Sequence, residues 1–81
     1  MIITIDVGNT NITVGVFNGD EIVASFRMTT KMPRTSDEYG MLLTNLLEQN
    51  RIHCDEIQDA IIASVVPNVM HSVVNAMKKY F

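Results

Sequence analysis

Apolar and polar side chains alternate over the first third of the chain, the pattern of half-buried β-strands. Residues 2–7 are apolar or β-branched apart from one acid at their end, and residues 12–17 follow a period of two. The apolar positions of this second run are Ile12, Val14 and Val16. Residues 21–30 repeat the alternation, with an apolar side made of Ile22, Ala24, Phe26 and Met28. Because Asn18-Gly19-Asp20 is a strong hairpin signal, the pattern predicts an antiparallel three-stranded meander.

The hydrophobic period changes to that of a helix after a break at residues 31–34, where Pro33 cannot continue a strand. Thr35 or Ser36 is the expected cap of a helix over residues 37–51. Its apolar stripe is Tyr39, Leu42, Leu43, Leu46 and Leu47. Glycine is unfavourable inside a helix, so Gly40 is interpreted as marking a place where this helix lies close to the sheet.

The rest of the chain predicts one more strand and one more helix. Residues 52–58 are a connector, and the almost wholly apolar run 59–66 is typical of a strand buried on both faces of a parallel sheet. Pro67 suits the first turn of a final helix. Its apolar side is Val69 or Met70, then Val73, Val74, Met77 and Phe81. The fold class is therefore α/β, with the order β-β-β-α-β-α and helices packed against a mixed sheet.

Length and composition narrow the class of protein. The 81 residues allow one small domain, and a net charge of −3 without a basic stripe argues against nucleic acid or an anionic membrane as partner. No apolar run approaches the ~20 residues that cross a bilayer. Cys54 is the only cysteine, which excludes an intrachain disulfide and predicts a soluble, cytoplasmic protein. The last helix stops at residues 79–81 without a Gly or Asn cap, so we expect a piece of something larger.

The turn between the first two strands is the main candidate for chemistry. It consists of Gly8, Asn9, Thr10 and Asn11, and Asp6 stands at the end of the strand before it. Gly8 lets a phosphate approach the backbone, neighbouring N–H groups can face an anion, and Asp6 can hold a hydrated Mg²⁺. Asn and Gly are also ordinary hairpin residues, so a purely structural turn stays open as the alternative.

The chain has a few other candidate sites outside this turn. His53-Cys54-Asp55 is interpreted as a surface connector, because adjacent residues rarely converge on one metal ion. His71 is expected to be solvated or interfacial, and Cys54 to be unreactive. Ser64 ends the buried strand, where it either lines a ligand cleft or, as favoured, satisfies backbone groups.

Four motifs in order resemble the type III pantothenate kinases of the acetate kinase, sugar kinase and actin superfamily. They are Asp6-Val7-Gly8-Asn9-Thr10-Asn11, Arg27, Thr35-Ser36-Asp37-Glu38-Tyr39-Gly40 and Ala63-Ser64-Val65-Val66-Pro67. The resemblance covers essentially the whole chain. It implies a ribonuclease H-like (actin-like ATPase) half-domain over residues 1–81, the N-terminal phosphate-binding half of a two-domain, dimeric kinase.

The resemblance also implies a reaction, the ATP-dependent phosphorylation of pantothenate in the first step of coenzyme A biosynthesis. Asp6 would support Mg²⁺ and the ATP phosphates, and a monovalent cation (K⁺ or NH₄⁺) is implied as well. The phosphate loop would comprise Gly8, Asn9 and Thr10, with Asn11 and Thr13 at its edge. The general base and most pantothenate contacts would lie beyond Phe81, so the isolated chain is expected to be inactive. The alternative is a non-catalytic nucleotide-binding or oligomerisation module.

Overall fold

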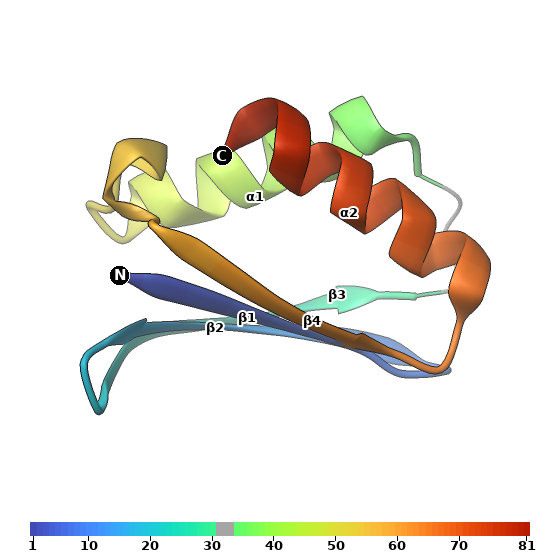
Figure 1. Cartoon of the computed structure of the whole chain (residues 1–81), viewed down its shortest axis with the longest axis horizontal. Helices are drawn as coiled ribbons and strands as arrows, with labels where there is room; N and C mark the ends of the chain where they lie inside the picture. The colour runs from blue at the N-terminus through green and yellow to red at the C-terminus, as the bar shows by residue number, and fades with distance from the viewer. Residues whose placement is uncertain (31–33) are drawn as a thin grey trace.

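Four strands form one sheet in the computed structural model, which describes residues 1–30 and 34–81 (Figure 1). The strands are β1 (Ile2–Val7), β2 (Asn11–Asn18), β3 (Glu21–Thr29) and β4 (Asp59–Ser64). The helices are α1 (Ser36–Gln49) and α2 (Pro67–Tyr80), with a short 3₁₀ turn at Cys54–Glu56. The break predicted at residues 31–34 lies outside the described residues except for Arg34.

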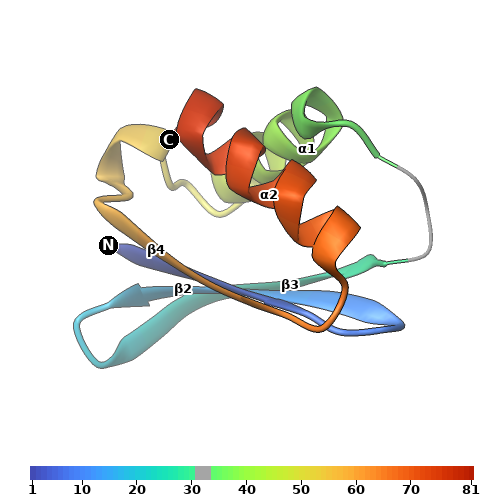
Figure 2. The same cartoon turned by 45° about the vertical axis from the view of Figure 1, so that its right-hand side comes forward.

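The sheet has the order β3-β2-β1-β4. The first three strands pair antiparallel, and β4 pairs parallel to β1. Both helices lie over the same face of the sheet, as the two views agree (Figures 1 and 2). This arrangement confirms the predicted order β-β-β-α-β-α and the mixed sheet.

The beginning of α1 is fixed by a capping box. The hydroxyl of Thr35 accepts a hydrogen bond from the N–H of Glu38 (3.1 Å), and the carboxylate of Glu38 accepts one from the N–H of Thr35 (2.9 Å). These bonds satisfy donors that the first turn of a helix leaves without partners. Of the two caps proposed from the sequence, Thr35 is the one the structure uses.

The core lies between the helices and the covered face of the sheet. Alternate residues of β1 and β2 point into it, as the period of two predicts. Fully buried core side chains include Ile3, Ile5, Val7, Ile12, Val14, Val16, Tyr39, Leu43, Leu47, Val73 and Ala76. The half-buried Leu42 and Leu46 flank the buried stripe of α1.

The prediction that residues 59–66 form a strand buried on both faces is wrong. The strand ends at Ser64, and its residues alternate between exposed and half-buried. Ile61 is 60% exposed. The physical reason is that both helices cover the same face of the sheet, and β4 is an edge strand, so every second side chain of the run faces away from the core.

The alternation predicted for residues 21–30 is also broken near its start. Val16 pairs with Ala24 but Phe17 pairs with Ile22, so Val23 is an extra residue and the ladder is irregular there. A bulge of this kind shifts the residues before it to the opposite face. Ile22 therefore lies with Phe17 rather than with the core, and it is 55% exposed.

Gly40 makes a close contact between the two helices rather than between helix and sheet. A Cβ atom added to Gly40 would fall onto the aromatic ring of Tyr80 in α2. Gly40 itself is buried. The missing side chain thus lets the end of α2 lie against the first turns of α1.

Candidate functional site

The turn between β1 and β2 is a compact, hydrogen-bonded loop. The N–H of Gly8 donates to the carbonyl oxygen of Asn11 (3.0 Å), and a Cβ at position 8 would come within 3.2 Å of that same oxygen. A larger residue at position 8 would require this carbonyl to shift by a few tenths of an ångström. Asn9 and Thr10, at its tip, are exposed. The turn therefore presents two polar side chains to solvent on a closed backbone.

Asp6 and Thr13 lie side by side next to this turn. They are cross-strand partners in the β1–β2 ladder, and both are exposed on the face of the sheet that the helices leave uncovered. No ion pair to Asp6 occurs within residues 1–30 and 34–81. The structure thus brings together all six residues proposed from the sequence: Asp6, Gly8, Asn9, Thr10, Asn11 and Thr13.

The available amide donors are more limited than the sequence suggested. Since the N–H of Gly8 is bonded to Asn11, it is not free to bind an anion. Among the described residues, the N–H groups of Asn9 and Thr10 donate to no backbone carbonyl. Consecutive amides of this kind form the anion-binding concavities of many phosphate loops.

Thr30 is a residue of this site that the sequence analysis missed. Its hydroxyl donates to the carbonyl oxygen of Gly8 (2.8 Å), and its N–H donates to the carbonyl oxygen of Thr10 (3.0 Å). Its side chain is buried, with 6% of the residue exposed. The available signal was indirect, since a threonine directly after the third strand falls opposite the turn only if the strand register is known.

A shallow groove lies beside the turn, between the outer edge of β3 and α1. Its polar lining comes from Asn11, Arg27, Thr29 and Arg34, and its apolar lining from Met28, Leu42 and Leu46. A guanidinium N–H of Arg34 donates to the carbonyl oxygen of Thr29 (2.7 Å), and the guanidinium lies 5.7 Å from the ring centre of Tyr39. Arg34 thus ties the end of β3 to the first turn of α1.

The end of β4 approaches the turn from the other side. The N–H of Val65 donates to the carbonyl oxygen of Val7 (3.1 Å), next to Gly8. The hydroxyl of Ser64 donates to the carbonyl oxygen of Val66 (3.0 Å) and accepts from its N–H (2.9 Å). Ser64 therefore satisfies local backbone groups, as the favoured interpretation expected.

The remaining candidates from the sequence lie in the 3₁₀ turn at Cys54–Glu56, just before it, and in α2. Cys54 is a free, half-buried thiol, and His53 and His71 are exposed. No three metal-binding side chains of the His, Cys, Asp or Glu type gather anywhere in the part of the chain that the structure describes. Neither described helix is long and apolar enough to span a membrane.

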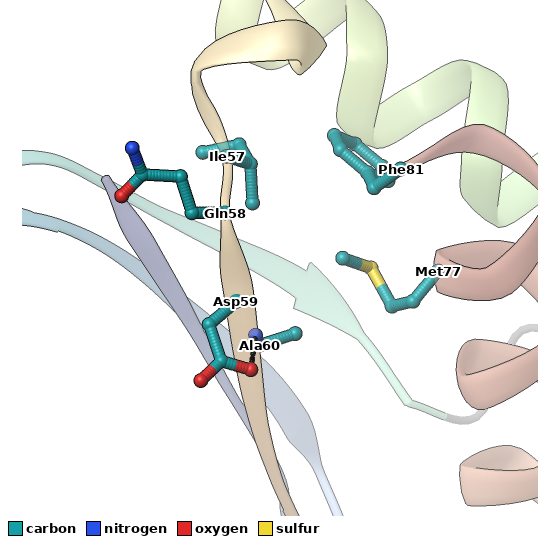
Figure 3. Close-up of a pocket in the computed structure, with 6 residues that line it drawn as sticks. All are labelled: Ile57, Gln58, Asp59, Ala60, Met77 and Phe81. Atoms are coloured by element: carbon teal, nitrogen blue, oxygen red, sulfur yellow. Dashed lines mark hydrogen bonds between the residues drawn. The ribbon is translucent and has the colours of Figure 1, made fainter.

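A second hollow lies at the opposite end of the sheet, between the start of β4 and the end of α2 (Figure 3). Its volume is about 100 Å³, and it is lined by Ile57, Gln58, Asp59, Ala60, Met77 and Phe81. The carboxylate of Asp59 accepts a hydrogen bond from the N–H of Ala60 (2.8 Å). Because Asp59 pairs with Ile2, at the far end of β1 from the turn, this hollow is separate from the candidate site.

Comparison with known proteins gives one consistent result. The family model described as type III pantothenate kinase matches residues 2–81. A type III pantothenate kinase of Agathobacter rectalis is 70% identical over all 81 residues, which are 31% of its length. Those of Bifidobacterium animalis subsp. lactis and Bifidobacterium longum subsp. infantis are 48% and 45% identical over 99% of the chain, covering 32% and 31% of their lengths. The chain thus spans about a third of the length of these curated relatives.

Proposed function

Because the chain belongs to the type III pantothenate kinase family, we propose that it forms the N-terminal, phosphate-binding part of an ATP-dependent pantothenate kinase. The observation that carries this proposal is the geometry at the end of β1. An exposed carboxylate, two exposed polar side chains and two amides that donate to no carbonyl of the described backbone meet there on a closed turn. ATP phosphates are the ligand class that such a loop suits.

The proposed roles follow from the chemistry of phosphoryl transfer, in which a protein mainly positions the phosphates and neutralises their charge. The amides of Asn9 and Thr10, with their side chains, would donate to phosphate oxygens. Asn11 and Thr13 would contact them from the edge of the loop. None of the described residues is proposed as the general base, and we expect the chain by itself not to turn over pantothenate.

Asp6 fits a magnesium ion that arrives with ATP. Mg²⁺ keeps several waters and commonly takes only one or two carboxylates together with substrate phosphates. One exposed carboxylate next to a phosphate loop matches this requirement, whereas a fully protein-bound metal would need the three-ligand group that the described residues lack. A bound magnesium ion would neutralise phosphate charge. The requirement for K⁺ or NH₄⁺ rests on the family resemblance, and we assign no residue of this chain to binding that cation.

The proposal includes a larger assembly. By resemblance, residues 1–81 would belong to the N-terminal domain of a two-domain, homodimeric, cytoplasmic enzyme, with most of the pantothenate site outside these residues. The exposed apolar side chains Ile2, Ile22 and Ile61 on the uncovered face of the sheet are consistent with further protein packing there.

A chimera tests the proposal directly. The 81 residues that match this chain in the Agathobacter rectalis relative would be replaced by this chain, and phosphorylation of pantothenate by Mg·ATP would be measured. We expect an active chimera that loses at least about 100-fold in kcat/KM on Asp6→Asn, since charge-stabilising groups of active sites contribute on this scale. The matched control is Asp20→Asn in the β2–β3 hairpin, which should leave the activity unchanged. Full activity of the Asp6→Asn chimera would refute the site.

The second candidate function is a non-catalytic module that acts by association. The observation that favours it is the exposed edge strand β4, on which Ile61 is 60% exposed and charge is confined to Asp59. Edges of this kind readily pair with another strand. Sedimentation of the 81-residue chain decides the point, since a folded monomer at all concentrations would exclude self-association.

A further inference from the structure

We infer that Thr30 is a positioning residue for the phosphate-binding turn: its hydroxyl holds the Gly8–Asn9 peptide in the one orientation that presents the amide of Asn9 to an anion. This inference rests on the function proposed above. Its starting point is the hydrogen bond between Thr30 and Gly8. Thr30 is the buried polar residue among those described, and its hydroxyl donates a hydrogen bond to the carbonyl oxygen of Gly8 (2.8 Å).

The orientation of the Asn9 amide follows from the planarity of the peptide bond. In a trans peptide the C=O of one residue and the N–H of the next point in opposite directions. When the carbonyl of Gly8 is directed at the hydroxyl of Thr30, the N–H of Asn9 must point away from Thr30. Asn9 is exposed, and its N–H donates to no backbone carbonyl among the described residues, so this amide is available to an anion from solvent. Fixing one end of the peptide therefore fixes the donor at the other end.

The peptide needs such a restraint because Gly8 precedes it. Glycine adopts conformations on both sides of the φ/ψ map at little cost, so a peptide next to it can rotate between alternative turn types. A rotated Gly8–Asn9 peptide would present a carbonyl oxygen, which repels phosphate. The bond from Thr30 lowers the free energy of one orientation, at a position where the backbone alone restrains little.

Thr30 makes one hydrogen bond through its backbone and another through its hydroxyl, so substitutions of the side chain can test the hydroxyl alone. Its N–H donates to the carbonyl of Thr10 whatever the side chain is. Thr30→Val keeps this bond and the side-chain shape and removes only the hydroxyl, whereas Thr30→Ser keeps the hydroxyl and removes the methyl group. The pair thus isolates the contact with Gly8.

Thr44 supplies a matched control. Its hydroxyl donates to the carbonyl of another glycine, Gly40, at the same distance of 2.8 Å, but from a half-buried threonine inside α1. Thr44→Val removes the same kind of bond away from the turn. Any general effect of losing a threonine hydroxyl that donates to a glycine carbonyl should appear in both Thr30→Val and Thr44→Val.

The first measurement is kinetic and uses the chimera. We expect Thr30→Val to raise the KM for Mg·ATP about 5- to 10-fold, the equivalent of one hydrogen bond, with less than a twofold change in the KM for pantothenate. Thr30→Ser and Thr44→Val should stay within about twofold of the parent. An unchanged KM in Thr30→Val, or an equal loss in Thr30→Ser, would overturn the inference. A chimera that is insensitive to Asp6→Asn would instead refute the proposed function.

The second measurement needs no ligand. Amide hydrogen exchange of the 81-residue chain reports the bond from the Gly8 N–H to Asn11, which a rotating turn would break. We expect exchange at Gly8 to speed up at least about 5-fold in Thr30→Val and not in Thr44→Val. Equal exchange at Gly8 in all variants would show that the hydroxyl does not hold the turn, whatever the enzyme does.

Discussion

Ile5 and Asp6 are neighbours in β1, yet their side chains lie on opposite faces of the sheet and have different roles. Ile5 faces the helices and is 1% exposed, whereas Asp6 faces away from them and is exposed. The pleat of the strand alone causes this difference, because successive side chains point to opposite faces. The covered face therefore provides the stability of the fold, and the uncovered face, at its turn end, provides the polar groups of the candidate site.

The site can be polar without weakening the protein because its side chains lie on the uncovered face of the sheet. The exposed side chains of the uncovered face remain hydrated, so they cost little free energy of folding. The polar group that is buried beside the site, the hydroxyl of Thr30, has a partner in Gly8. No buried side-chain polar atom lacks a hydrogen-bond partner in the part of the chain that the structure describes.

The largest expected effect separates the two faces within one strand. Ile5→Ala should lower the free energy of unfolding by about 2 to 5 kcal/mol, because it removes buried methyl groups and leaves a cavity under the helices. Urea denaturation followed by circular dichroism measures the change. The free energy of unfolding of so small a domain is only a few kcal/mol, so the variant is expected to be partly unfolded at 37 °C.

Asp6→Asn is the matched variant on the opposite face. Its free energy of unfolding should stay within about 0.5 kcal/mol of the parent, as for most exposed substitutions. Equal losses in Ile5→Ala and Asp6→Asn would mean that the division of labour between the faces is wrong.

The next effect tests the contact between the helices. Alanine normally stabilises a helix relative to glycine by about 1 kcal/mol, but a Cβ at Gly40 would fall onto the ring of Tyr80. We expect Gly40→Ala to destabilise the protein by about 1 to 2 kcal/mol, in the range of overpacked contacts. In the background of Tyr80→Ala the same substitution should become stabilising. Thermal unfolding of the four variants shows whether the sign reverses.

The smallest effect concerns the exposed pair that joins the ends of the helices. Lys79 donates to the carboxylate of Asp37 (2.6 Å), as does the hydroxyl of Tyr80 (3.0 Å). The hydrogen bond from Lys79, followed by that from Tyr80, lowers the pKa of Asp37 below its ordinary value of 3.8. The hydrogen bond to Asp37 raises the pKa of Lys79 above 10.5. Both side chains are more than half exposed, so solvent screens the pair strongly.

These two directions define the pH window of the pair. The contribution of Asp37 is complete above its ordinary pKa and is lost as the pH falls through the lower folded value. The contribution of Lys79 is complete below its ordinary pKa and is lost as the pH rises through the higher folded value. An NMR titration of the Asp37 carboxyl should show a pKa below 3.8 that rises in Lys79→Met. An unshifted parent value would contradict the pair.

Local patterns in the sequence were sufficient for the elements and for the residues of the turn. The period of two located the first three strands, and an apolar run located β4. The helical stripe of Tyr39, Leu43 and Leu47 located α1, and the capping residues limited its start to two positions. The same local chemistry placed Asp6 next to Gly8, Asn9 and Thr10, because these residues are adjacent along the chain. The structure confirms these elements and the cap at Thr35.

Features that depend on distant segments were decided only by the tertiary structure. Whether the apolar run of β4 is covered depends on which face both helices occupy, and the side on which Ile22 lies depends on the irregular pairing at Phe17. The bond from Thr30 to Gly8 joins residues 22 positions apart, and the contact of Gly40 with Tyr80 joins the two helices. Sequence periodicity shows which side of a single helix or strand is apolar. Strand register and the packing of elements against one another are set by the free energy of the whole folded chain.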